Sequence, residues 1–124
     1  MILVDTSVWI EHLREGVADL VEALGRGEVV MHPFVVGELA CGNLSDREDT
    51  IELLQQLRSV AVADHAEVMA FIEAQRLYGC GIGYIDVHLL ASSAIDGAKL
   101  WTNDRRLREL AATLDLVAPL GRLP

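Results

Sequence analysis

"ILVDTSVWIEHLR", residues 2–14, decides how this chain begins to fold. Its first three residues, Ile2–Val4, are apolar and predict a short strand that is buried on both faces. Asp5 follows directly, and the residues from Ser7 to Arg14 are typical of a helix. A carboxylate therefore stands where a strand gives way to a helix.

The same arrangement recurs near the other end of the chain, in "LWTNDRRLREL", residues 100–110. Here Asp104 follows the predicted strand 98–102 and opens the predicted helix 104–114. Taken alone, Asp5 is explained as a helix cap and Asp104 as an acid in a first helical turn. Their matching positions raise the question of whether the two acids share a site.

Composition restricts the class of protein. The chain has 124 residues, of which 52% are hydrophobic and 23% charged, so we expect one folded domain over residues 1–124. No apolar run approaches the roughly 20 residues of a membrane helix, and Asp5 comes too early for a signal peptide. We therefore expect a cytoplasmic protein. Cys41 and Cys80 lack metal-ligand spacing and are interpreted as small apolar residues.

The net charge of −9 argues against a protein that simply coats nucleic acid, because phosphate contacts need cations. If this chain handles a polyanion, metal ions, a local arginine patch or a partner must supply the positive charge.

Predicted strands and helices alternate along the chain, which favours a mainly parallel sheet of about five strands with helices on both faces. The strands are predicted over residues 2–4, 28–32, 60–63, 98–102 and 115–119, and the helices over 7–14, 17–27, 33–41, 45–59, 64–79, 84–97 and 104–114, the second of them ending at Gly25 or Gly27. Ligands of such sheets bind outside the carboxyl ends of the strands, where Asp5 and Asp104 are expected.

Two further acids are expected near the same crevice. The predicted helix that holds Asp86 is apolar around nearly its whole circumference, so we expect this aspartate to be buried and to need a cation, a donor or a proton. Glu38 lies about one turn into the helix that follows the second strand. The alternatives are a hydrogen-bonded structural role for Asp86 and a solvated surface position for Glu38.

Four carboxylates in one crevice would repel one another, by about 4 kcal/mol for a pair 4 Å apart at an effective dielectric of 20. Protonation or divalent cations relieve this repulsion. Oxygen-only ligands favour Mg²⁺ or Mn²⁺, ions that also bind phosphates.

These features together resemble the PIN-domain ribonucleases and, within them, the VapC toxins of bacterial toxin–antitoxin pairs. The resemblance rests on "ILVDTSVWIEHLR", "VVGELACG", "IDVHLLASSAIDGAKLWTND" and the order of the four acids, and it covers essentially the whole chain. It implies a PIN-like three-layer α/β/α fold. Tyr84 stands where many relatives have a proline-containing lead-in to this acidic helix.

Carried over residue by residue, the family pattern makes Asp5, Glu38, Asp86 and Asp104 the catalytic, metal-binding acids. Glu38 is left with three alternative roles: holding a second ion, orienting water or acting as a base. The hydrogen-bond donors expected around these acids are Thr6, Ser7, Thr102 and Asn103, which are equally explained as helix caps.

The resemblance also implies hydrolysis of RNA by an activated water with Mg²⁺ or Mn²⁺. It implies a homodimer, higher assemblies with a VapB-like antitoxin, and inhibition by that antitoxin. An RNA contact is expected from Arg105, Arg106 or Arg108, whose alternative is a solvated helix face.

Three other functions compete with this one. A receiver-like phosphoacceptor needs a lysine at the end of a late strand, and Lys99 begins the fourth strand instead. A haloacid-dehalogenase-like phosphatase needs a second aspartate where Ser7 stands. A catalytically silent PIN fold that only binds a partner stays open.

Overall fold

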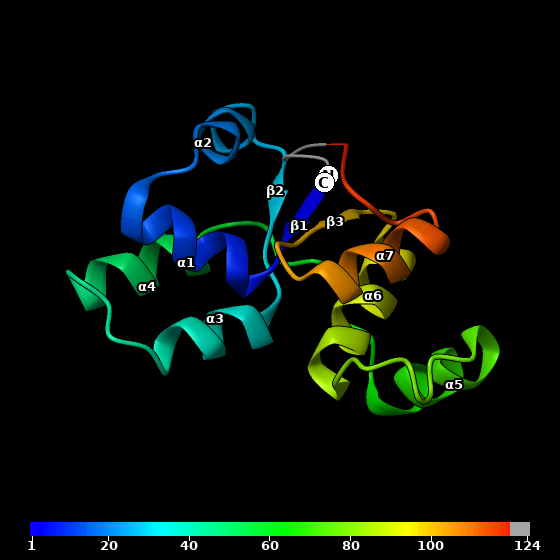
Figure 1. The fold of residues 1–124 in the computed structure, drawn as a ribbon. Coiled ribbons are helices and arrows are strands. Elements are labelled where there is room, and N and C mark those ends of the chain that lie inside the picture. Colours follow the sequence, from blue (N-terminus) through cyan, green and yellow to red (C-terminus); the bar gives the residue numbers. More distant parts are fainter. Residues whose placement is uncertain (120–124) are drawn as a thin grey trace.

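The computed structural model describes residues 1–119, whose central sheet pairs three parallel strands in the order β2–β1–β3 (Figure 1). These are β1 (Ile2–Val4), β2 (Val29–Val30) and β3 (Lys99–Trp101). In register, Leu3 lies opposite Val30 on one side and Leu100 on the other. The predicted α/β class and parallel sheet are confirmed.

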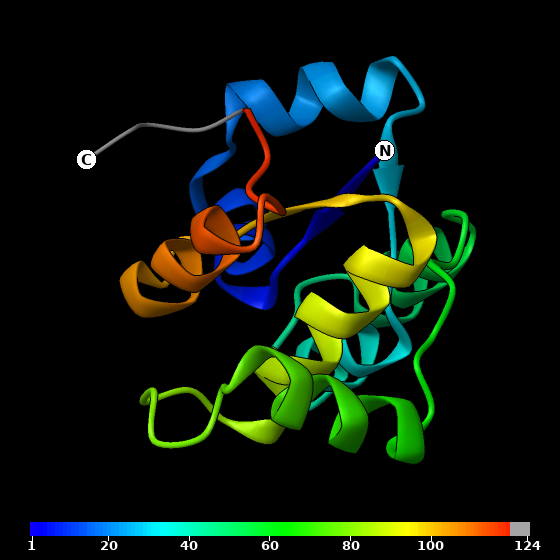
Figure 2. The same ribbon diagram turned by 90° about the vertical axis from the view of Figure 1, so that its right-hand side faces the viewer.

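Helices cover both sides of this sheet. Within the described residues they are α1 (Thr6–Glu15), α2 (Ala18–Gly25), α3 (Pro33–Ala40), α4 (Arg47–Gln55), α5 (His65–Gln75), α6 (Tyr84–Asp96) and α7 (Arg105–Thr113). Figure 1 places α1 to α4 on one side of the sheet and α5 to α7 on the other. Figure 2, turned to face that second side, shows α5, α6 and α7 in front of the strands. None of the helices described is long and apolar enough to cross a membrane.

The predicted strand over residues 60–63 is wrong. Only Ser59 pairs at this edge of the sheet, as an isolated parallel bridge to Met31. Beyond it, the side chain of Asp96 takes the backbone N–H of Ala61, with a donor–acceptor distance of 2.8 Å. Helix α6 thus binds the backbone of the segment that follows this bridge.

The predicted fifth strand, residues 115–119, is likewise reduced to a single parallel bridge, between Val117 and Leu100. Its two hydrogen bonds join the backbone of Leu100 to the carbonyl of Leu116 and to the N–H of Ala118. The sheet therefore has three strands rather than five, with one bridge beyond each edge strand.

Two predicted helices also have wrong boundaries. The helix predicted over residues 45–59 starts only after Asp46, whose φ of 47° places it in the left-handed region, and it ends at Gln55. The helix predicted over 64–79 stops at Arg76, which has a φ of 53°. The chain then turns to bury Leu77 in the core, at 6% exposure.

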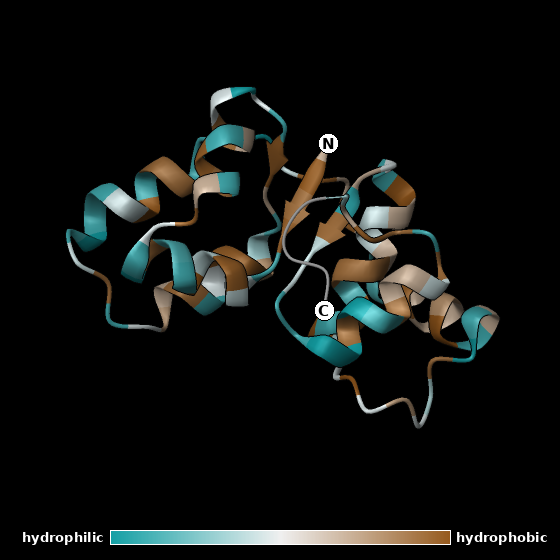
Figure 3. Ribbon diagram, turned by 45° about the horizontal axis from the view of Figure 1, so that its top comes forward, coloured by the Kyte–Doolittle hydropathy of each residue, from teal (hydrophilic) through white to brown (hydrophobic). Residues whose placement is uncertain are grey.

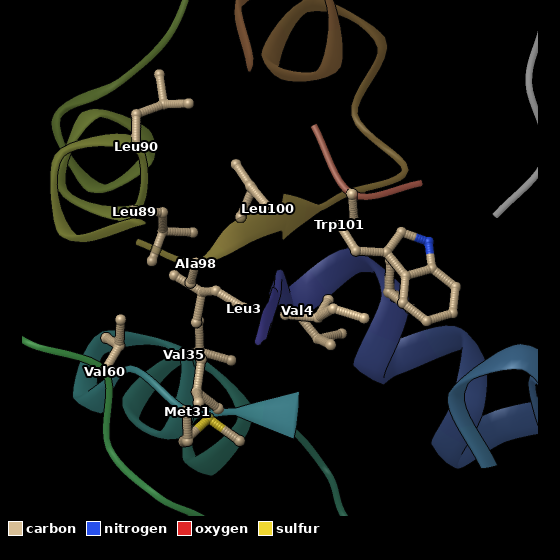
Figure 4. Packing of buried hydrophobic residues seen from close by; sticks show 14 of the residues in the cluster. Leu3, Val4, Met31, Val35, Val60, Leu89, Leu90, Ala98, Leu100 and Trp101 are labelled. Carbon is tan, nitrogen blue, oxygen red and sulfur yellow. The ribbon is translucent and has the colours of Figure 1, made fainter. Parts of the chain in front are cut away.

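The core explains why both layers of helices are needed. Leu3 and Val4 are completely buried, because a short parallel strand in this fold has no solvent-facing side. Figure 4 shows Leu3 between Leu89 of α6 and Val35 of α3, while Trp101 lies beside α1. In Figure 3, β1 and β2 are hydrophobic along their length, whereas the helices mix both kinds of residue.

His32 ends the second strand and caps α3. Its Nδ1 accepts a hydrogen bond of 3.0 Å from the backbone N–H of Phe34, and its side chain is fully buried. Burial, with a smaller contribution from the nearby His88, lowers the pKa of His32 from 6.5 to about 4. The folded chain therefore holds His32 neutral.

Because the pKa of His32 is lower in the folded chain, its contribution to stability is complete above pH 6.5 and is lost as the pH falls towards 4. By linkage this loss amounts to about 3 kcal/mol. His32→Asn retains a capping acceptor but does not titrate, so its unfolding free energy should change less over that range. Urea denaturation at a series of pH values measures both slopes. Equal slopes in the two proteins would contradict the assignment.

Candidate active site

Asp5 is held between the ends of β1 and β3. Its backbone N–H donates to the carbonyl of Trp101 at 2.8 Å, and its carboxylate is buried. One carboxylate oxygen, Oδ1, accepts from the backbone N–H of Thr6 at 2.8 Å. The other, Oδ2, accepts from the hydroxyls of Thr102 at 2.6 Å and Ser7 at 3.0 Å. This carboxylate is therefore fixed in place by three donors.

The same two hydroxyls also accept hydrogen bonds from the turn that follows β3. Thr102 Oγ1 accepts from the backbone N–H of Asp104, and Ser7 Oγ accepts from that of Asn103, each at 3.0 Å. Each hydroxyl thus joins the Asp5 carboxylate to the backbone next to Asp104. This pair of hydroxyls sets how the ends of β1 and β3 lie relative to each other.

Asp104 is exposed and caps α7. Its Oδ1 accepts from the backbone N–H of Leu107 at 2.9 Å. Asp104 is thus a helix cap rather than the first-turn acid of the alternative interpretation, while the cap interpretation is correct for Asp5, which caps α1. Capping does not remove either acid from the crevice, because both helices begin at the carboxyl edge of the sheet.

Glu38 reaches the same edge from α3. Its carboxylate is exposed, and Oε1 accepts a hydrogen bond of 2.7 Å from the hydroxyl of Thr6, the residue next to Asp5. Thr6 therefore connects the two acids: its backbone N–H binds Asp5 and its side chain binds Glu38.

Asp86 lies in the first turn of α6 and is half-buried, whereas the sequence predicted full burial. The buried part of the helix runs over residues 87–93, because the first turn projects past the core. Its Oδ2 accepts from the backbone N–H of Gly83 at 3.3 Å.

Desolvation raises the pKa of Asp86, and the negative charges of Asp5, Asp104 and Glu38 raise it further. The hydrogen bond from Gly83 acts in the opposite direction. The four predicted acids therefore share one electrostatic environment at the carboxyl edge of the sheet.

The donors in this environment are all oxygen atoms, the chemistry that Mg²⁺ and Mn²⁺ prefer. As they stand, however, no three acidic, histidine or cysteine side chains within residues 1–119 converge on one ion position. Glu38 and Asp104 are exposed, and each accepts one hydrogen bond, from the hydroxyl of Thr6 and from the backbone N–H of Leu107 respectively. In its chemistry, the oxygen donor set of the four acids fits such an ion.

Arg108 and Asn103 have partners that the sequence did not predict. Arg108 is half-buried and donates to the backbone carbonyl of Thr102 at 2.9 Å, so it stabilises the turn that follows β3. The side-chain amide of Asn103 donates to Glu11 at 3.0 Å rather than to one of the four acids. The sequence does contain a signal for the position of Arg108: it lies four residues after Asp104, and this spacing places both residues on the same side of one helix.

The lysine position argues against a phosphoacceptor. Lys99, the single lysine of the sequence, starts β3 at the end away from Asp104, and its Nζ donates to the carbonyl of Asp115 at 2.5 Å. Ser7, which stands in place of the second aspartate of a dehalogenase-like phosphatase, donates to Asp5 instead.

Neutralising Asp86 tests whether the acids repel one another. In chelator, Asp86→Asn should unfold at the same temperature as the unaltered chain or higher, because it removes a charge that desolvation and three neighbours disfavour. Differential scanning calorimetry measures the two midpoints. A clearly lower midpoint would make Asp86 a structural residue.

Replacing Thr102 tests the hydroxyl link. Thr102→Val keeps the shape of the buried side chain but removes the donor to Asp5 and the acceptor for Asp104, at a cost of about 1–3 kcal/mol. Thr102→Ser is the matched control, since it keeps the hydroxyl. Urea denaturation should rank the valine variant below the serine variant, and equal stability would contradict the link.

Comparison with known proteins identifies the family of the chain. The PIN domain pattern matches residues 2–113, an interval that includes all four acids. Ribonuclease VapC32 from two strains of Mycobacterium tuberculosis is 49% identical over 113 residues, which cover 90% of this chain and 91% of that protein. The chain belongs to the PIN-domain family and, within it, is a relative of the VapC proteins.

Proposed function

We propose that this chain is a metal-dependent endoribonuclease and the toxin of a toxin–antitoxin pair. The observation that carries the proposal is the shared electrostatic environment of Asp5, Glu38, Asp86 and Asp104 at one edge of the sheet. The relatives from Mycobacterium tuberculosis are named as ribonucleases, which agrees with this chemistry.

The cofactor of the proposed reaction is Mg²⁺ or Mn²⁺, held by Asp5, Asp86 and Asp104, with Glu38 nearby. When bound, such an ion binds phosphate oxygens, lowers the pKa of a bound water and stabilises charge on a leaving oxygen. It also relieves the repulsion that raises the pKa of Asp86.

The side chains themselves orient the reactants. Ser7 and Thr102 hold the Asp5 carboxylate in one position through its Oδ2 atom. Glu38 is exposed and has one oxygen, Oε2, for which no donor is recorded among the described residues, so it suits the role of proton acceptor for an attacking water. Arg108 keeps the turn after β3 in place through the carbonyl of Thr102.

A groove beside Glu38 suits the antitoxin. It has a volume of about 700 Å³ and lies between α1 and the segment that joins α3 to α4. Ile10, Leu13 and Leu39 give it apolar walls, and its charged lining residues are the acids Glu38 and Asp46 and one cation, Arg14. An amphipathic segment with basic residues, from a VapB-like antitoxin, would match both properties. A homodimer, a larger assembly with the antitoxin and a cytoplasmic location stay predictions from the sequence.

The proposal predicts that the purified chain cuts total bacterial RNA at discrete positions with Mg²⁺ or Mn²⁺ and stops in chelator. Asp86→Asn should slow cleavage by more than about 100-fold, because even outer-shell partners of metal ligands cost about 10- to 100-fold. Sequencing of the new RNA ends measures both the rate and the sites.

Asp64→Asn is the matched control, since it removes the same charge from the cap of α5, where asparagine also caps well. It should cut at the rate of the unaltered chain. Absence of cuts under every condition, from a folded chain free of antitoxin, would favour a silent PIN fold that binds a partner.

A further inference from the structure

Tyr84 is an exposed aromatic residue next to the acidic site. It opens α6 two residues before Asp86, and 41% of its surface is exposed. Its ring stands edge-on against His88, with centroids 4.7 Å apart and planes at 85°. Its hydroxyl lies 2.6 Å from Nδ1 of His65, the first residue of α5. The ring is thus held in one orientation while part of it faces solvent.

These aromatic contacts extend to the helix that carries Glu38. Phe34 of α3 also packs edge-on against His88, with centroids 4.7 Å apart. Phe34 and Glu38 are four residues apart, so they lie on the same side of α3. The group formed by Tyr84, His88 and Phe34 therefore lies between the two helices that supply Asp86 and Glu38.

Arg106 provides a cation at the other end of the loop that leads into Asp86. A Cβ atom on Gly81 would lie 3.6 Å from Nε of Arg106, so this side chain rests against the loop. Its ion pair with Glu109, at 3.6 Å, is exposed on both sides and therefore weak. Arg105 pairs with the same Glu109, but its side chain is 91% exposed.

The distribution of charge favours this side of the molecule for a polyanion. Residues 1–57, which include α1 to α4, contain 11 acidic and three basic residues. Residues 58–119, which include α5 to α7, contain eight acidic and six basic residues. Since the two groups of helices lie on opposite sides of the sheet (Figure 1), repulsion of RNA is much weaker on the side of α5 to α7.

We propose that Tyr84 and Arg106 bind the RNA strand at the two ends of the segment 81–84: Arg106, which lies against Gly81, contacts a phosphate, and Tyr84 stacks on an unpaired base. This proposal rests on the proposed ribonuclease function. Stacking on an aromatic ring requires a splayed base, so the surface selects single-stranded RNA over a duplex. Tyr84 is then a substrate-binding residue that determines where the strand lies relative to the acids.

Binding to a fluorescein-labelled, single-stranded 12-nucleotide RNA of mixed sequence tests the proposal. Fluorescence anisotropy is measured with the Asp86→Asn chain, so that cleavage does not interfere. Adding Tyr84→Leu should weaken binding about 5- to 150-fold, the range for one stacked base, without changing the salt dependence. Adding Arg106→Ala should reduce the slope of log affinity against log salt concentration by about 0.7, the value for one phosphate contact on a single strand.

Tyr78→Leu and Arg26→Ala are the matched controls, because they remove the other tyrosine and an exposed arginine of the acidic half. Both should bind as the parent does. Tyr84→Phe keeps the aromatic ring, so its affinity for the single-stranded RNA should be nearly that of the parent. This variant shows whether the ring itself is needed for binding. If the leucine variant weakens binding to the duplex of the same sequence equally, or if it changes the molar mass measured by light scattering, the stacking role is overturned.

The two proposals fail separately. If the unaltered chain cuts RNA while the Tyr84 and Arg106 variants bind like the controls, the surface is wrong and the ribonuclease stands. If RNA binds with the expected losses but is never cut, the surface stands and the ribonuclease is wrong.

Discussion

The buried carboxylate of Asp5 is the constraint on which the arrangement of this edge of the sheet depends. It is the one acidic side chain that is buried among residues 1–119, and a buried charge needs partners. Thr6, Ser7 and Thr102 supply them, from the start of α1 and from the end of β3. Because the same hydroxyls also bind the backbone after β3, satisfying Asp5 brings Asp104 to the crevice.

The helices that begin at this edge offset part of the accumulated negative charge. Asp5 and Asp104 accept N–H groups at the starts of α1 and α7, and Asp86 accepts the N–H of Gly83 at the start of α6. Each helix start contributes about 0.3–1 kcal/mol towards an acid. These N–H groups favour the charged form of the acids, whereas desolvation first, and then the charges of Asp5, Asp104 and Glu38, raise the pKa of Asp86. A site of this kind retains an attraction for cations.

The two sides of the sheet differ in charge and in the binding surfaces that they present. The side of α1 to α4 is strongly acidic and holds the groove beside Glu38, which suits a basic partner. The side of α5 to α7 is nearly neutral and presents Tyr84 and Arg106 around the approach to Asp86. An inhibitor and a substrate of opposite charge would therefore approach the same four acids from different directions.

The local pattern of the sequence was enough to predict the parallel α/β class and the helix or strand end to which each acid belongs. A strand, an acid and a helix in succession leave few places for Asp5 and Asp104, since the ends of parallel strands meet at one edge.

Only the tertiary structure decided which contacts form between segments that are distant along the chain. The strand expected over residues 60–63 is reduced to one bridge at Ser59, and the N–H of Ala61 is bound by Asp96, 35 residues away. The hydrogen bond from Arg108 to the carbonyl of Thr102 depends on how helices pack against the rest of the chain. The partial burial of Asp86 depends on the same packing. Such contacts join segments that are distant along the chain. Hydrophobic periodicity predicts helices and strands, but it does not predict which side chain binds which backbone group.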